Sequence, residues 1–443
     1  MLAHHYTEAG LTEPAIHYWQ QAGERAKERS AYVEAVAHLT QSLTLLSTFP
    51  DTSEYLQREL DIQVALGPAL MAIKGQAAPE VERAYARAGE LCQQLGDTPQ
   101  LFPVLRGLIM YHHARGQLGT AYRLGEQLLH LAQSQHESEL LLVAHYSLGF
   151  VLFLQGEPTS AFTHHTQALT IYTQQAYRSQ TARYGVDLGV ASHSYAAWEL
   201  WQLGYAEQSL QHSREALTLA QTVSHAYSLA FALLYAAFLH QFRCDPPAVQ
   251  EQTAALTTLA REQGFKLWEA RGTILQGWAL TAQGQGEAGM SQMRQGLAAD
   301  LATGAKAWHP YFLSMLAEAY EAGGQPEAGL NALIEAQAVM DTIEVRFYEA
   351  ELHRLKGVLL LKQSVSDASL AETCFHETLD VARRQQGKFW ELRAAMSLAR
   401  LWQSQGKCQD AHDVLAPVYD WFTEGFDTAD LQEANALLNE LDA

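Results

Sequence analysis

Apolar positions along this chain recur every three or four residues, in runs several helical turns long that are separated by short polar segments. This spacing places the apolar side chains on one face of a helix. Ala, Leu, Gln and Glu, which favour helices, dominate the runs, and no window alternates Val, Ile or Thr with polar residues as a half-buried strand does. The pattern predicts an all-α protein.

Many of the runs are joined by a glycine that is followed five positions later by a small residue. The glycine permits the left-handed backbone conformation that ends a helix, and the small residue lets the next helix cross the first one closely. The pairs are Gly10/Ala15, Gly116/Ala121, Gly156/Ala161, Gly204/Ser209, Gly284/Gly289, Gly324/Gly329 and Gly406/Ala411. Each unit is therefore predicted to be a helical hairpin.

The hairpins recur at a nearly constant interval. Gly116 and Gly156 are 40 residues apart, as are Gly284 and Gly324. Turn-forming residues replace the glycine near Cys244-Asp245 and near Ser366-Asp367, and with these two turns the period of about 40 residues continues to Gly406. The predicted hairpins span residues 99–133, 138–175, 186–223, 226–263, 266–303, 308–341, 347–385 and 388–423. Hairpins of fixed period stack on one another, so we expect a right-handed superhelical solenoid.

The predicted organisation is one repeat array followed by a cap. The array covers residues 1–427, with about ten to eleven hairpins and weaker phasing over residues 1–96, and residues 428–443 form a C-terminal capping helix. An irregular connection near residues 177–186 accounts for the 48-residue step from Gly156 to Gly204 and is long enough to be a functional loop. Leu2 to Ala9 reads as half a hairpin, so we expect the chain to be a fragment or a separate reading frame of something longer.

Several phrases of the sequence resemble known repeat proteins. The glycine turn and the phrase Leu316-Ala317-Glu318-Ala319-Tyr320 are similar to tetratricopeptide repeats, stretched from their usual length. Three longer phrases resemble one particular family: AHHYTEAGLTEPAIHYWQQAGERA (residues 3–26), ELRAAMSLARLWQSQGK (391–407) and APVYDWFTEGFDTADLQEANALL (416–438). It is the C-terminal repeat region of bacterial signalling proteins that combine a class III adenylate or guanylate cyclase with an AAA-type, STAND-like ATPase.

The resemblance implies a sensing or scaffolding arm that controls an upstream nucleotide-hydrolysing domain, in cis or in trans. The chain itself has no cyclase segment and no Walker A motif. Gly387-Lys388 is followed by Phe389, and Gly406-Lys407 by Cys408, so neither offers the Ser or Thr that would hold magnesium. The activities of that family are therefore not assigned to these residues.

Charge and cysteine usage exclude several other classes. A formal net charge of −20 repels phosphate backbones, so we expect no nucleic-acid partner. Cys92, Cys244, Cys374 and Cys408 form no CxxC pair, which is typical of free thiols in a reducing compartment. The N-terminus shows no signal peptide, and the most apolar stretches are shorter than the roughly 20 residues of a membrane helix. We expect a cytoplasmic protein without membrane contact.

Catalytic and metal motifs are not found in the sequence. His112-His113 and His164-His165 are adjacent pairs, which point about 100° apart on a helix and do not chelate one ion together. HExxH and GxSxG are absent, and the carboxylates fall on periodic helix faces, where solvated charge is the commoner explanation. We predict no enzymatic activity, no cofactor and no metal site.

Aromatic residues supply the candidate binding site. Tyr195, Trp198 and Gln202 share one face of the helix predicted from Val190 to Leu203. In tetratricopeptide arrays the first helix of each pair lines the concave groove, so this face is a candidate to bind a protein segment or small effector. Residues on first helices of other pairs complete the candidate set: Tyr111, His145, Tyr235 and His240. An aromatic stripe at helical spacing is more often typical of core packing.

Three functions follow as hypotheses. The first is a non-enzymatic module that binds a protein segment or effector and regulates a signalling ATPase or cyclase. The second is the effector-binding arm of a STAND-type transcription activator whose DNA contacts lie in another domain. The third is a self-contained enzyme that uses the connection from Tyr177 to Val186 and the aromatic residues near Trp198, and no residues at catalytic spacing support it.

Overall fold

The structure of the protein is a computed structural model that describes residues 2–96, 98–174, 184–364 and 367–442. These residues contain 22 α-helices and no strand, as the sequence predicts. The helices are α1 (Leu2–Glu8), α2 (Thr12–Glu28), α3 (Tyr32–Leu46), α4 (Ser53–Lys74), α5 (Pro79–Leu95), α6 (Leu101–Ala114), α7 (Leu118–Gln135), α8 (Ser138–Leu154), α9 (Pro158–Gln174), α11 (Leu188–Gln202), α12 (Ala206–Val223), α13 (Ala226–Phe242), α14 (Pro246–Gln263), α15 (Lys266–Ala282), α16 (Gly286–Ala302), α17 (His309–Ala322), α18 (Pro326–Thr342), α19 (Glu349–Gln363), α20 (Ala368–Arg384), α21 (Lys388–Ser404), α22 (Cys408–Tyr419) and α23 (Ala429–Leu441). Among them, none is long and apolar enough to cross a membrane.

The hairpin turns are formed as the sequence predicts. All seven predicted turn glycines have positive φ, between +68° and +100°. Cys244 takes the glycine position between α13 and α14 with a φ of 55°, and the Asp245 carboxylate caps α14 by accepting a hydrogen bond from the Ala248 amide. The other predicted replacement turn, at Ser366-Asp367, lies partly outside the described residues.

Small residues bring the two helices of a hairpin into backbone contact. The clearest case is α15 against α16, where a Cβ on Gly289 would lie 2.4 Å from the Gly277 carbonyl oxygen. A Cβ on Gly277 would in turn lie 2.7 Å from the Gly289 carbonyl oxygen. The helices can therefore cross at this distance only with glycine at both positions.

First and second helices of a hairpin have different burial. All residues of α11 except His193 are buried. Its partner α12 buries one stripe, Ala206, Ser209, Ser213, Ala216 and Ala220, at steps of three and four residues. First helices thus form the inside of the solenoid and second helices form its outside.

The solenoid closes on itself in its middle part. The Ala114 carbonyl, at the turn after α6, accepts hydrogen bonds from the amides of Lys306 and Ala307 at 2.9 and 3.3 Å. One hairpin later, the Leu154 carbonyl accepts from the amides of Arg346 and Phe347 at 2.7 and 3.2 Å. These contacts join residues that are 192 or 193 positions apart in the sequence. The loops before α17 and α19 therefore fill the inside of the turn formed by α6 to α13.

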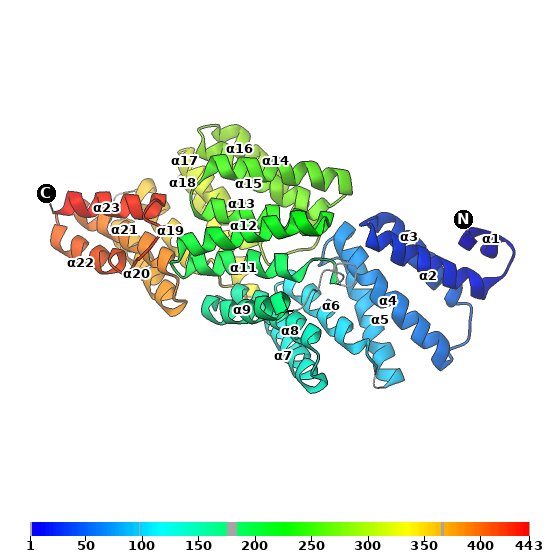
Figure 1. The fold of residues 1–443 in the computed structure, drawn as a ribbon. Helices are drawn as coiled ribbons and strands as arrows, with labels where there is room; N and C mark the ends of the chain where they lie inside the picture. Colours follow the sequence, from blue (N-terminus) through cyan, green and yellow to red (C-terminus); the bar gives the residue numbers. More distant parts are fainter. Residues whose placement is uncertain (1, 97, 175–183, 365–366, 443) are drawn as a thin grey trace.

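The two ends of the chain lie at opposite ends of the molecule (Figure 1). The helices α1 to α5 form the N-terminal end. There Leu60, Ala88, Leu91 and Cys92 make a small apolar cluster of their own with Val104 of α6. The helices α19 to α23 form the C-terminal end. There α23 packs against α21 and α22 and contributes side chains to the concave face described next.

Candidate binding groove

The aromatic residues predicted to bind a partner lie together in the closed middle of the solenoid. Tyr195 is 3% exposed and Trp198 1% exposed. The Trp198 ring stacks on Tyr235 at 4.1 Å between centroids, and its Nε1 donates a hydrogen bond to the Tyr235 carbonyl at 2.9 Å. The Tyr235 hydroxyl donates to the Tyr195 hydroxyl at 2.6 Å. In this structure the three side chains form core.

Gln202 shows what covers this face. Its side-chain amide donates a hydrogen bond at 2.7 Å to the carbonyl of Phe347, in the loop before α19. The Phe347 ring lies 5.3 Å from Phe153 and 5.1 Å from Trp308, so the loop supplies aromatic packing as well. Helical spacing correctly groups Tyr195, Trp198 and Gln202, but it carries no information on a loop 145 residues away.

The remaining three predicted residues lie apart from one another. Tyr111 is buried, and its hydroxyl donates to Glu82 Oε2 at 2.7 Å. His145 is half-buried with its Nδ1 3.0 Å from His164 Nδ1, and His240 is half-buried with its Nδ1 3.6 Å from Asp245 Oδ2. None of the seven predicted residues lines the open groove described below, and their role in binding stays a prediction. Most of the predicted functional loop, residues 177–183, lies outside the described residues.

An open groove lies on the concave face of the C-terminal half. Its cavity volume is about 980 Å³. The first helices α15, α17, α19 and α21 form it together with α20 and α23. Its lining residues are Cys244, Pro246, Trp278, Thr281, Ala282, Glu318, Ala319, Glu321, Ala322, Arg354, Leu355, Val358, Leu361, Lys362, Ala368, Phe375, Arg393, Met396, Ser397, Arg400, Leu401, Ser404, Gln405, Asp430 and Glu433.

A network of buried charges forms the floor of the groove. Arg393 donates two hydrogen bonds to Asp430, at 2.8 and 2.9 Å, and a third to the Phe242 carbonyl at 2.6 Å. Glu351 accepts two hydrogen bonds from Arg354, at 2.6 and 2.9 Å, and lies 3.5 Å from Arg393 Nη1. Burial alone would raise the pKa of Glu351, but the two arginines outweigh it and the pKa is lowered. Glu351 is therefore a carboxylate at neutral pH.

Glu318 is the floor residue that changes charge near neutral pH. Burial raises its pKa to about 7, the negative charge of Glu351 adds to the rise, and Arg354 opposes it. Trp278 Nε1 donates a hydrogen bond to Glu318 Oε2 at 3.0 Å, which holds the carboxyl group against the wall of the groove.

Above the floor the groove has an apolar wall and a charged rim. Leu355, Val358, Leu361, Phe375, Met396 and Leu401 form the wall. On the rim Lys362 pairs with Glu321 and Arg400 pairs with Glu433. Exposed ion pairs of this kind contribute little free energy, so their members can break the pair and bind a charged group of a ligand instead. An apolar wall with a few placed charges suits binding of an extended chain segment.

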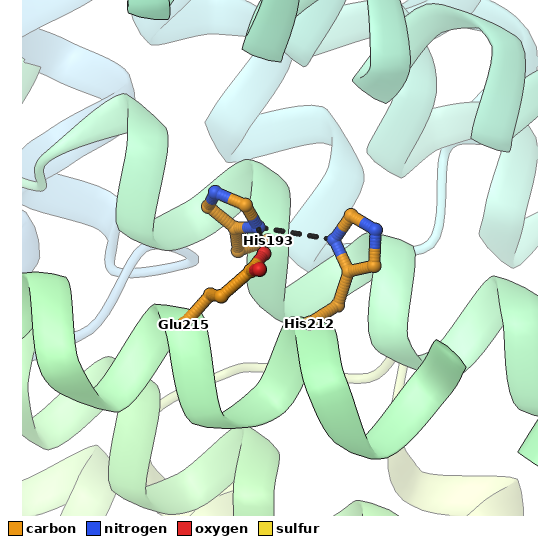
Figure 2. A group of neighbouring side chains, drawn as sticks. All are labelled: His193, His212 and Glu215. Carbon is orange, nitrogen blue, oxygen red and sulfur yellow. Dashed lines mark hydrogen bonds and ion pairs between the residues drawn. The ribbon is translucent and has the colours of Figure 1, made fainter. Parts of the chain in front are cut away.

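A second group of side chains has the composition of a metal site. His193 on α11 faces His212 and Glu215 on α12, as Figure 2 shows. Adjacent histidine pairs in the sequence do not point to this group, because its members come from two helices. A signal was present in the sequence: His145 and His164 stand 48 residues before His193 and His212, at the same positions of the preceding hairpin.

No family model matches the chain. An uncharacterized protein of Rhizobium meliloti is 24% identical over 365 residues, which cover 81% of this chain and 35% of that protein. The chain thus spans about a third of the length of the curated relative it matches.

Solved structures of low sequence identity share the fold. A Rap protein complexed with competence and sporulation factor aligns over 91% of this chain and 99% of its own, with 13% identity and a TM-score of 0.56. The apo form of the quorum sensor NprR from B. thuringiensis aligns over 84% and 99%, with 13% identity and a TM-score of 0.50. The Rap conjugation gene regulator of plasmid pLS20, in complex with the Phr* peptide, aligns over 86% and 96%, with 10% identity and a TM-score of 0.50. The predicted tetratricopeptide-like solenoid is confirmed.

Proposed function

We propose that this chain is a non-enzymatic repeat module whose C-terminal groove binds a segment of protein chain. The observation that carries the proposal is the groove itself, about 980 Å³ in volume and lined by an apolar wall, a charged floor and a rim of exposed ion pairs. Ligand pockets have volumes of roughly 300 to 1,000 Å³ and are mostly apolar with a few placed polar groups. Two solved structures of similar fold are complexes with a peptide or a sporulation factor, which supports a peptide ligand here.

We further propose that the module is the regulatory arm of a signalling ATPase or nucleotide cyclase in the cytoplasm. The phrases shared with the repeat region of such proteins support this context, as does the relative that is nearly three times as long as the matched part. Four successive first helices and α23 line the groove, so a ligand that bridges them would change the rotation between hairpins. Small rotations add up along a solenoid.

Peptide selection tests the groove. A phage-displayed peptide library would be selected on the full chain, and the selected peptides measured on two tryptophan variants. Ala322 is exposed and lines the groove, whereas Ala254 is exposed on α14 outside the groove. We expect Ala322→Trp to weaken peptide binding at least roughly tenfold, the effect of losing about 1.4 kcal/mol. Ala254→Trp should bind as the wild type does.

Two results would contradict the proposal. Equal binding by the Ala322→Trp and Ala254→Trp variants would place the peptides outside the groove. Hydrolysis of ATP or GTP by the purified chain, lost on substitution of a groove residue such as Glu318, would make it an enzyme.

A further inference from the structure

The cluster of His193, His212 and Glu215 lies on the hairpin of α11 and α12, away from the groove. Within α12, His212 and Glu215 are three residues apart and therefore project from the same face. His193 reaches toward both from α11 (Figure 2). Its Nδ1 lies 3.0 Å from His212 Nδ1 and 3.1 Å from Glu215 Oε2.

These distances fit a shared metal ion. All three ligand atoms lie within 4.8 Å of one another. Zinc binds His nitrogen at about 2.0 to 2.1 Å in a tetrahedron, whose ligand atoms are then about 3.3 to 3.4 Å apart. The observed 3.0 and 3.1 Å separations would widen by only a few tenths of an ångström to admit the ion.

The side chains have the protonation that a metal requires. Burial lowers the pKa of His193 to about 4, and His212 adds to this while Glu215 opposes it. Burial also lowers the pKa of His212. Both imidazoles are therefore neutral at pH 7, which is the form that binds metals. A neutral imidazole carries one ring proton, so His193 Nδ1 donates to at most one of its two neighbours.

The preceding hairpin provides an internal comparison. His145 and His164 hold their Nδ1 atoms 3.0 Å apart, as His193 and His212 do. The position that corresponds to Glu215, three residues after His164, is Gln167. Gln167 has no negative charge, so this hairpin has the two imidazoles without the carboxylate.

We propose that His193, His212 and Glu215 bind a divalent transition-metal ion, Zn²⁺ being the best match to two imidazoles and one carboxylate. The ion links the two helices of one hairpin. The Glu215 side chain is 42% exposed, so a fourth position is open to water or to a ligand from a partner. The site shares no residue with the groove.

Zn²⁺ titration of the full-length, metal-free chain tests the site, with calorimetry for affinity and Co²⁺ absorption for tetrahedral coordination. We expect one ion per chain. His212→Ala should abolish binding, and the nearly isosteric Glu215→Gln should weaken it by at least the roughly 10- to 100-fold that loss of an outer-shell partner costs. Circular dichroism verifies that each variant keeps its helices, and Glu215→Gln, at a partly exposed position, keeps the test valid if His212→Ala unfolds.

The neighbouring hairpin supplies matched controls. His164→Ala should leave Zn²⁺ affinity and stoichiometry unchanged, because that pair lacks the carboxylate. Gln167→Glu should add a second ion. The proposal is overturned if the wild type binds no Zn²⁺ or Co²⁺ at a twofold excess, if Glu215→Gln binds as tightly as the wild type, or if Gln167→Glu still binds one ion.

Discussion

The concave face of this solenoid is covered in its middle part and open in its C-terminal half. In the middle, the first helices α11 and α13 are covered by the loops before α17 and α19, and their aromatic residues are core. In the C-terminal half, the first helices α15, α17, α19 and α21 leave an open groove. The same kind of helix therefore supplies stability in one region and a binding surface in the other.

The substitution with the largest expected effect on stability is Trp198→Ala, in the covered middle region. Because Trp198 is 1% exposed and packs against four aromatic rings from α8, α13 and the loop before α17, its removal should lower the free energy of unfolding by about 3 to 5 kcal/mol. Trp421→Ala, at a site 38% exposed, is the matched control and should cost far less. Urea denaturation followed by circular dichroism measures both. Equal losses would mean that the middle of the solenoid is not closed.

Gln202→Leu tests the loop that covers the middle region. The substitution leaves the buried Phe347 carbonyl without its side-chain donor, which should cost about 1 to 3 kcal/mol in the free energy of unfolding. Gln405→Leu, at an exposed position on the groove, should change it by less than about 0.5 kcal/mol. The same urea experiment applies, and a neutral Gln202→Leu would show that the loop contributes no stability through this bond.

The open region should respond to pH through Glu318. The folded protein keeps the proton of Glu318 up to about pH 7, whereas in the unfolded chain the carboxyl group has its ordinary pKa of 4.5. The folded state binds more protons in this window, so the contribution of Glu318 to stability falls as pH rises from 4.5 to 7 and stays low above it. The effect is on the order of 1 to 2 kcal/mol, because solvent in the groove screens the charge.

Glu318→Gln isolates this contribution. The amide keeps an acceptor for Trp278 but carries no charge. We expect the variant to gain stability relative to the wild type at pH 8 and to match it at pH 5. A difference between the two proteins that does not change with pH would assign the effect to packing.

The sequence predicts the local structure of this fold well. The glycine-to-small spacing identifies the turns, because a positive φ and a close helix crossing each restrict the residue at one position. Closure of the middle region is not predictable in this way. It depends on pairs such as Leu154 with Phe347, which no periodic pattern links.

Buried carboxylates show the same limit. Glu199, Glu351 and Asp300 stand on helical runs where solvated carboxylates are expected, yet all three are 0% exposed. Each has a cationic or imidazole partner on another helix: His165 for Glu199, Arg393 for Glu351 and Arg271 for Asp300. Burial of these groups follows from the stacking of hairpins, so only the three-dimensional structure shows which carboxylates are buried.

The hydrogen bonds that the Lys306 amide donates to the Ala114 carbonyl, and the Arg346 amide to the Leu154 carbonyl, also have a consequence for folding during synthesis. A ribosome adds about 5 to 20 residues per second, so each accepting carbonyl is synthesised about 10 to 40 s before the amide that donates to it. During that time the aromatic face of α11 and α13 has no cover. The nascent middle hairpins therefore expose their most apolar surface until the loops before α17 and α19 have left the ribosome, and a chaperone or an early partner has its best access to Trp198 in that interval.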